Sequence, residues 1–199
     1  MARPMSANQA LREIPRKLFH ILSLFYFLAY RSLGTKRILF WMGPWTVLVV
    51  GIEISRMAFP AFNRLVFSPF AGIARPEEKN RISGIFHTTL GTFTLFIFFR
   101  DSPRTVAAAL GCAALGDGAA ALFGKAFGRH KIFSGKTLEG SLACLAACAA
   151  CGLAAGFSLL PSLLAATAAT AVEMAPSTAF FNDNFWIPVV AAIVIHWTG

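Results

Sequence analysis

The stretch "PRTVAAALGCAALGDGAAALF" (residues 103–123) decides the expected fold. It is long and apolar enough to cross the hydrocarbon core of a bilayer as a helix, which takes about 20 residues. One ionisable side chain, Asp117, interrupts it about two turns before its end. Because a charge inside a membrane is costly, such a residue marks a candidate functional site.

The composition of the whole chain also indicates a membrane protein. Of 199 residues, 56% are hydrophobic and only 14% are charged, and 20 are phenylalanine. Soluble domains are about 45–50% apolar and about 25% charged. The mean hydropathy is +0.63. We therefore predict an integral membrane protein.

Seven apolar segments are candidate spans, and together they predict an all-α bundle of about seven transmembrane helices in a single domain, residues 1–199. The first is followed by "YRSLGTKR" (residues 30–37), which lacks a small-residue cleavage pattern, so we expect a retained anchor. The segments are Lys17–Tyr30, Ile38–Met57, Ile82–Phe99, Pro103–Phe123, Thr137–Phe157, Leu160–Ala175 and Phe185–Thr198.

The distribution of basic residues predicts the orientation, because cytoplasmic loops are enriched in Lys and Arg. Thirteen of the 18 Lys and Arg lie in the N-terminal segment and in the second and fourth loops. We therefore place the N-terminus and the active site in the cytoplasm (at the inner membrane if the source is bacterial), and the C-terminus outside. The net charge of +9 is interrupted by apolar runs and forms no single hydrophilic face, so we expect no nucleic-acid partner.

Nine ionisable residues within or beside the predicted spans lie in the cytoplasmic half of the bundle. An ion pathway needs polar groups at several depths, so a small-molecule transporter is disfavoured. The asymmetry favours an enzyme that takes a water-soluble substrate from the cytoplasm and a lipid from the inner leaflet. These residues are Arg16, Lys17, His20, Glu53, His87, Asp117, Glu139, Glu173 and Asp183.

The sequence "SGKT" (residues 134–137) is not a Walker A loop. Six residues separate Gly128 from Gly135 where that motif has four, and a membrane helix precedes it in place of a strand. Lys136 and Thr137 still begin a helix whose free N–H groups favour anions. Beside Asp117, such a basic loop can hold a phosphate and its magnesium ion.

Simpler interpretations remain open for several residues. The spacing of Gly116, Ala120, Gly124 and Gly128 also fits close helix packing. Glu139 could complement a helix N-terminus.

Two further patterns have structural interpretations. We favour a surface ion pair for Glu53 and Arg56, and His20 and His87 could be merely hydrogen-bonded. The segment "RMAFPAFNRLVFSPF" (residues 56–70) is expected at the membrane surface, where its aromatic face can enter lipid, either as a simple connector or as an entry site for the substrate. The four cysteines are expected to pack as small apolar residues.

Five motifs then carry a family resemblance. "RKLFHI" (16–21), "GDGAAALFGKAFG" (116–128), "GKTLEGS" (135–141), "VE" (172–173) and "NDNFWIP" (182–188) occur in the order found in CTP-dependent lipid kinases. The chain resembles that family, which includes dolichol kinase, phytol kinase and the yeast-type diacylglycerol kinase. The resemblance implies transfer of the CTP γ-phosphate to a lipid hydroxyl, on a polyprenol, a phytol-type alcohol or diacylglycerol, which gives a lipid monophosphate and CDP.

The resemblance also implies roles for individual residues. Arg16, Lys17, Asp117 and His20 are expected to be catalytic, and Asp117, Asp183 and Glu173 to bind Mg²⁺. Lys125 stands where the family often has Arg, and it lacks the bidentate fork of Arg. The nucleotide-binding residues are expected to be Gly124, Lys125, Gly128, Arg129, Lys131, Lys136, Thr137 and Glu139.

A second CTP-using family shares part of this pattern. Phosphatidate cytidylyltransferases have a similar Asp-Gly and Lys-Thr-x-Glu-Gly stretch, but they typically add a downstream "HGG" and an Asp-Arg-x-Asp cluster. The chain contains neither. The kinase is therefore the favoured interpretation, and the cytidylyltransferase is the alternative.

Overall fold

The structure, a computed structural model, describes residues 7–70, 79–132, 135–178 and 181–199, with side chains from residue 25 onward except at residue 70. Every regular element in these ranges is a helix, and one isolated bridge joins Lys131 to Thr137. The predicted all-α fold is confirmed.

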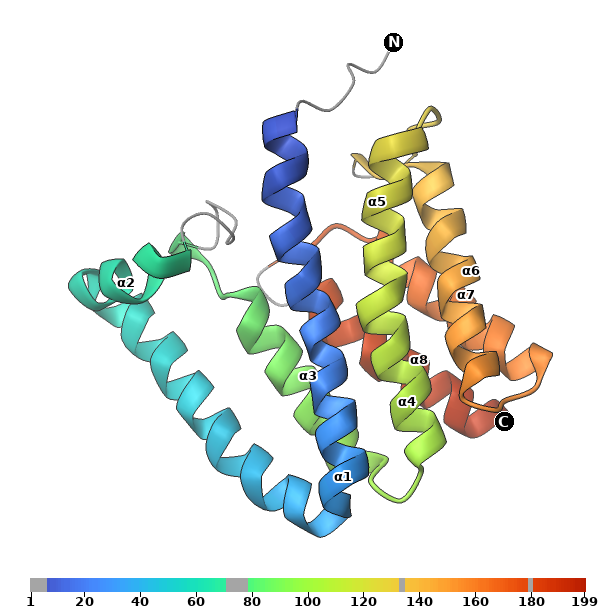
Figure 1. The fold of residues 1–199 in the computed structure, drawn as a ribbon, viewed down its shortest axis with the longest axis horizontal. Coiled ribbons are helices and arrows are strands. Elements are labelled where there is room, and N and C mark those ends of the chain that lie inside the picture. Colours follow the sequence, from blue (N-terminus) through green and yellow to red (C-terminus); the bar gives the residue numbers. More distant parts are fainter. Residues whose placement is uncertain (1–6, 71–78, 133–134, 179–180) are drawn as a thin grey trace.

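Helix α1 (Ala7–Ala58) is two helices joined at a sharp turn. Gly34 has φ 72° and ψ 169°, a left-handed conformation that favours glycine, and it reverses the chain. The two halves diverge from this turn as an open hairpin (Figure 1). At its closed end, the Tyr30 ring stacks on Phe96 at 5.2 Å, and the Tyr30 hydroxyl donates to the Arg100 carbonyl at 2.5 Å. The first half begins at Ala7, ten residues before the predicted start at Lys17. The prediction was based on apolar runs, and the polar residues before Lys17 can also form a helix.

The apolar stretch at residues 103–123 belongs to a continuous helical rod, and the type of helix changes within it. After α3 (Gly84–Phe98), the rod consists of α4 (Pro103–Gly111), the π-helical segment η3 (Cys112–Gly116) and α5 (Asp117–Phe127). The sequence did not predict the π-helical segment. π-Helical segments are rare in proteins, but those that occur often lie at functional sites. This one ends immediately before Asp117.

Three further helices pack beside this rod: α6 (Leu138–Ala154), α7 (Leu159–Met174) and α8 (Asp183–Thr198) (Figure 1). Small residues let them approach closely. A Cβ on Gly116 would lie 2.4 Å from Cys148 Sγ, and one on Gly140 would lie 2.7 Å from the Ala120 carbonyl oxygen. Cys112, Cys144 and Cys148 are buried free thiols in this core, so the packing role predicted for them is confirmed.

Among the described residues, two helical stretches are long and apolar enough to cross a membrane: Phe25–Ala58, which contains the turn at Gly34, and Pro103–Phe127. Gly84–Phe98, Leu138–Ala154 and Leu159–Met174 are apolar but shorter. Large apolar side chains are exposed along the second half of α1, for example Phe40, which is 69% exposed. These features support a membrane protein only weakly, so the number of crossings and the orientation stay predictions.

Glu53 and Arg56 were predicted to pair at the surface, and the predicted location is wrong. The two side chains do pair, with Arg56 Nε donating to Glu53 Oε2 at 2.9 Å, but both residues are buried. The backbone N–H of Ser83 donates to Glu53 Oε1 at 2.7 Å, and Arg56 also donates to the Arg81 carbonyl. The pair therefore ties the end of α1 to the start of α3, because the chain folds back over it.

The short helix α2 (Pro60–Phe67) and the 3₁₀ turn η1 (Ser68–Phe70) follow α1. None of the α2 residues is buried against the rest of the described chain, and Phe59 and Leu65 are 64% and 69% exposed. This exposure agrees with the expected place at a membrane surface, which stays a prediction.

Candidate functional site

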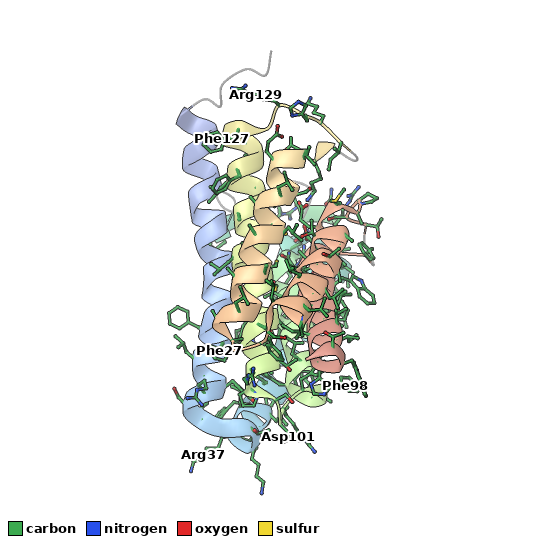
Figure 2. The ribbon with its side chains drawn as sticks, turned by 90° about the vertical axis from the view of Figure 1, so that its right-hand side faces the viewer. Phe27, Arg37, Phe98, Asp101, Phe127 and Arg129 are labelled. Carbon is green, nitrogen blue, oxygen red and sulfur yellow. The ribbon has the colours of Figure 1, made fainter. Side chains whose placement is uncertain are left out.

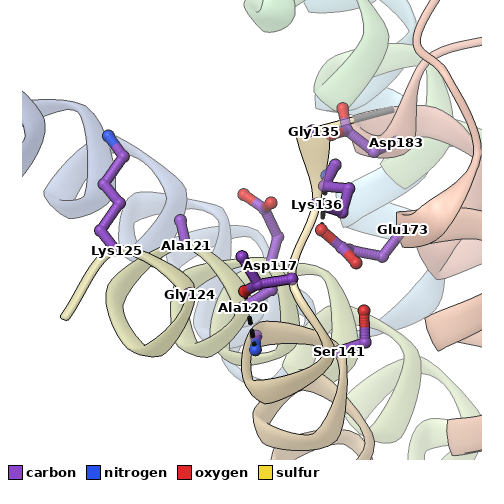
Figure 3. A pocket seen from close by; sticks show the side chains of 12 residues that line it. Asp117, Ala120, Ala121, Gly124, Lys125, Gly135, Lys136, Ser141, Glu173 and Asp183 are labelled. Atoms are coloured by element: carbon purple, nitrogen blue, oxygen red, sulfur yellow. Dashed lines mark hydrogen bonds and ion pairs between the residues drawn. The ribbon is translucent and has the colours of Figure 1, made fainter. Parts of the chain in front are cut away.

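A cavity of about 180 Å³ lies among α5, α6, α7 and the start of α8 (Figure 3). It lies toward the end of the molecule where α5 ends and α6 begins, which is also the end at which α1 begins (Figure 1). Seven of the residues predicted for the site line it: Asp117, Gly124, Lys125, Lys136, Thr137, Glu173 and Asp183.

Two aspartates reach the cavity from opposite helices. Asp117 is the first residue of α5, directly after the π-helical segment, and it is buried. Asp183 is in the first turn of α8 and is also buried. The N-cap residue Asn182 accepts a hydrogen bond from the Asn184 N–H at 3.0 Å, which fixes the start of α8. The Asp183 carboxylate lies in the first turn of a helix, where the helix dipole stabilises a negative charge.

Lys136 and Glu173 form an ion pair across the cavity (Figure 3). Gly135 has φ +76°, which favours glycine, and the following Lys136 reaches from the loop to α7. Glu173 is only 3% exposed, and its other oxygen, Oε2, has no hydrogen-bond partner among the described residues. One carboxylate oxygen is therefore committed to Lys136, while the other accepts no hydrogen bond from the described part of the chain.

Thr137 and the glycines of α5 hold the basic loop against Asp117. The Thr137 hydroxyl caps α6 by accepting the Gly140 N–H at 3.2 Å. A Cβ on Gly124 would lie 2.9 Å from Thr137 Oγ1, and one on Gly128 would lie 2.7 Å from Thr137 Cγ2. Close helix packing, the simpler interpretation of the glycine spacing, is confirmed. A nucleotide-binding role for these two glycines stays a prediction.

Four predicted nucleotide-binding residues are not part of the described cavity lining: Gly128, Arg129, Lys131 and Glu139. Glu139 instead accepts a hydrogen bond from His130, whose ring Nδ1 lies 2.8 Å from Glu139 Oε1. The His130 N–H donates to the same carboxylate at 3.3 Å. With the bridge between Lys131 and Thr137, these bonds fix the shape of the loop. Glu139 anchors the loop from outside the cavity.

The N-terminal candidates are only partly placed. Arg16, Lys17 and His20 lie in the first half of α1, but their side chains are outside the part of the structure that is described. Helix α1 packs against the π-helical segment before Asp117, so their helix runs beside the site. His87 is buried, and its Nδ1 is bonded to the Ser83 carbonyl at 2.9 Å, near the Glu53 network and not on the described cavity lining.

Sequence reasoning missed Ser141, although it ends the motif "GKTLEGS". Ser141 lines the cavity, is buried, and its hydroxyl has no hydrogen-bond partner in the described chain. The signal was its position four residues after Thr137, because residues i and i+4 share a helix face. Ala120, Ala121, Gly135 and Gly140 complete the lining.

The donor set fits a magnesium ion shared with a substrate. Among the described residues, no three His, Cys, Asp or Glu side chains are grouped closely enough to hold a metal by themselves. Asp117 and Asp183 nevertheless line one cavity, and magnesium is usually bound by one or two carboxylates together with substrate phosphates. Glu173 is the weakest of the three predicted ligands, because one of its oxygens is paired with Lys136.

Comparison with known proteins found two curated relatives. The chain is 26% identical to a CTP-dependent diacylglycerol kinase 1 of Eremothecium gossypii over 213 aligned positions, which cover 92% of the chain and 66% of the relative. It is 27% identical over 135 positions to the protein of the same name from Saccharomyces cerevisiae, which cover 66% of the chain and 46% of the relative. The chain thus spans about two thirds of one relative and about half of the other. No family model and no solved structure matches it.

Proposed function

Because its similarity to two CTP-dependent diacylglycerol kinases supports membership of the CTP-dependent lipid kinase family, we propose that this protein transfers the γ-phosphate of CTP to the hydroxyl group of a membrane lipid. One observation supports the proposal most directly. A single cavity is lined by Asp117, Lys136 and Asp183, which come from three separate motifs of the resemblance.

The cavity can receive the phosphates at its basic side. The loop supplies Lys136, and the dipole of α6, which begins after Thr137, favours anions near the start of that helix. The Leu138 and Gly140 N–H groups are already bonded to the His130 carbonyl and the Thr137 hydroxyl. Lys125 lines the same cavity, although its amino group points away from the carboxylates (Figure 3). Phosphoryl transfer depends on positioning and on neutralising charge around the transferred group, and Lys136 with the helix dipole would supply positive potential for it.

The charges of the cavity lining support the proposal that a divalent cation accompanies the nucleotide. Three carboxylates and two lysines line it, so the side chains alone do not balance a nucleoside triphosphate. Asp117 and Asp183 would hold the magnesium ion. When bound, the ion neutralises phosphate charge and orients the transferred group.

The relatives are named for diacylglycerol, and we propose diacylglycerol as the first acceptor to test. Polyprenols and phytol-type alcohols belong in the same test. Apolar side chains such as Ala, Leu and Phe distinguish acyl from isoprenoid chains poorly, because apolar contacts are non-directional.

Labelled CTP tests the reaction. The purified full chain is incubated with lipid vesicles that contain diacylglycerol, a polyprenol, phytol or phosphatidate, and with CTP labelled at the γ-phosphate or in the base. We expect the γ-label to enter the lipid phase with at least one alcohol. Transfer of the base label to phosphatidate would establish the cytidylyltransferase instead, and transfer of neither label would contradict both activities.

A further inference from the structure

We propose that Glu173 Oε2 and Ser141 Oγ form the binding site for the hydroxyl group of the lipid acceptor. This inference rests on the proposed function and assigns the residues that receive its second substrate. It gives Glu173 a different role from the metal ligand expected from the sequence.

The first observation is the unused oxygen of Glu173. The residue is 3% exposed, and Lys136 occupies Oε1, while Oε2 has no partner among the described residues. A buried carboxylate oxygen without a hydrogen bond is destabilising, so such an atom in a cavity wall indicates a ligand that donates to it. Lys136 also restrains the carboxylate in one orientation.

The second observation is the unused hydroxyl of Ser141. It comes from a different helix, α6, and is buried at 5% exposure without a partner in the described chain. Figure 3 shows the Ser141 hydroxyl directed toward the Glu173 carboxylate. Both residues line the same cavity, but the structure contains no hydrogen bond between them. A small polar group placed between them would satisfy both.

An alcohol matches this pair better than a phosphate does. A hydroxyl group donates one hydrogen bond and accepts others, so it can donate to Glu173 Oε2 and accept from Ser141 Oγ. An ionised phosphate has only acceptors, and the carboxylate would repel it. The cavity thus separates its two substrates: Lys136 and the start of α6 attract phosphate, while the Glu173 and Ser141 pair selects the alcohol.

The reaction can be written with this placement. The lipid oxygen forms a new bond to the γ-phosphorus, and the bond from that phosphorus to the bridging oxygen of CTP breaks. CDP leaves with the bonding electrons. The hydroxyl proton moves along its hydrogen bond to Glu173 Oε2, which later releases it to water.

Ser141→Ala tests the hydroxyl site with the smallest change. In the full chain, with diacylglycerol vesicles and CTP, we expect the KM for diacylglycerol to rise about 5–10-fold, the effect of one neutral hydrogen bond. The KM for CTP should stay unchanged. Ser162→Ala is the matched control, because Ser162 is a buried serine whose hydroxyl bonds to the Ser158 carbonyl at the other end of α7. A rise in the KM for CTP alone would overturn the proposal.

Glu173→Gln tests the proton acceptor. We expect kcat to fall at least about 100-fold, the lower range for loss of a general base, while CTP binding measured directly stays within a few fold. Unchanged kcat would overturn the proposal. So would a kcat that recovers at high magnesium concentration, since that result would identify Glu173 as a metal ligand.

The two variants separate this inference from the proposed function. If the wild-type chain transfers no γ-label from CTP to any alcohol, the function itself fails and the inference fails with it. If the wild type is active and both variants retain its kinetics, only the inference fails. Ser141→Ala leaves the ion pair of Lys136 intact, so it stays informative even if Glu173→Gln is misfolded.

Discussion

At the scale of single residues, the site depends on how buried charges are partnered. Glu53 and Glu173 are both buried glutamates near helix ends, but their surroundings differ. Both oxygens of Glu53 accept hydrogen bonds from Arg56 and Ser83, whereas Glu173 has one oxygen without a described partner. A fully bonded carboxylate stabilises a structure, and a partly bonded one in a cavity is available for a ligand.

Asp117→Asn should abolish phosphate transfer while leaving a folded protein. The amide keeps the size of the side chain but removes the charge that would hold magnesium, so we expect a loss of at least about 1,000-fold in kcat. Transfer of the γ-label measures activity, and size-exclusion chromatography in detergent measures folding. Asp101→Asn is the control, since its side chain is 83% exposed at the opposite end of the molecule (Figure 2). Activity close to that of the wild type would remove Asp117 from the site.

At the scale of helices, the site is formed by the close contact of α5 with the start of α6. Helix α6 can approach because glycines face it, and Gly140 itself lies against the Ala120 carbonyl. The contact brings the basic loop to Asp117. The π-helical segment ends at Gly116, directly before Asp117. Its wider turn therefore sets the direction in which the Asp117 side chain projects from the rod.

Gly140→Ala should therefore separate the two helices. The added Cβ would lie 2.7 Å from the Ala120 carbonyl oxygen and 3.1 Å from Gly124 Cα. Overpacking of this kind costs about 1–3 kcal/mol, so we expect a lower thermal midpoint in detergent and weaker activity. Gly43→Ala is the control, because a Cβ there would meet nothing within 4 Å. An unchanged midpoint would mean that the helices can shift without cost.

Arg56→Ala should loosen the connection between α1 and α3. The substitution leaves Glu53 buried without its charge partner, a change that costs about 3–5 kcal/mol in buried pairs. We expect a clear fall in the thermal midpoint. Arg31→Ala, at an exposed position in the first half of α1, should leave the midpoint almost unchanged. Equal midpoints for the two variants would show that the buried pair contributes little.

At the scale of the whole molecule, the basic loop between α5 and α6 lies at one end of the helices, and the turns that connect the helices near Arg37 and Asp101 lie at the other. Arg129 lies at one end with the basic loop, and Arg37 and Asp101 lie at the other (Figure 2). The excess of Lys and Arg at the first end predicts that this end faces the cytoplasm.

Labelling of introduced cysteines tests this orientation. Arg129→Cys and Asp101→Cys are compared in sealed inverted membrane vesicles with a membrane-impermeant thiol reagent. We expect residue 129 to be labelled directly and residue 101 only after detergent is added. The unsubstituted chain is the control, because its described cysteines are buried or half-buried. The reverse pattern would contradict the predicted orientation.

Most of the helical segments were predictable because their signals are local. Apolar runs gave the helices, and Pro103, Ser83, Thr137 and Asn182 stand at helix starts, where proline and short polar residues are favoured. The segment η3 was not predictable, since its apolar residues suit an α-helix equally well. The motifs likewise indicated seven of the residues that line the cavity.

The sequence alone determined that the chain is helical and apolar, and that Asp117, Lys136 and Asp183 belong to functional motifs, because composition, spacing and capping are properties of neighbouring residues. Only the tertiary structure decided the partners. It paired Lys136 with Glu173, buried Glu53 with Arg56, and left the Ser141 hydroxyl without a partner in the described cavity wall. Those outcomes depend on contacts between helices far apart in the chain, and burial and pairing of charges are set by such contacts.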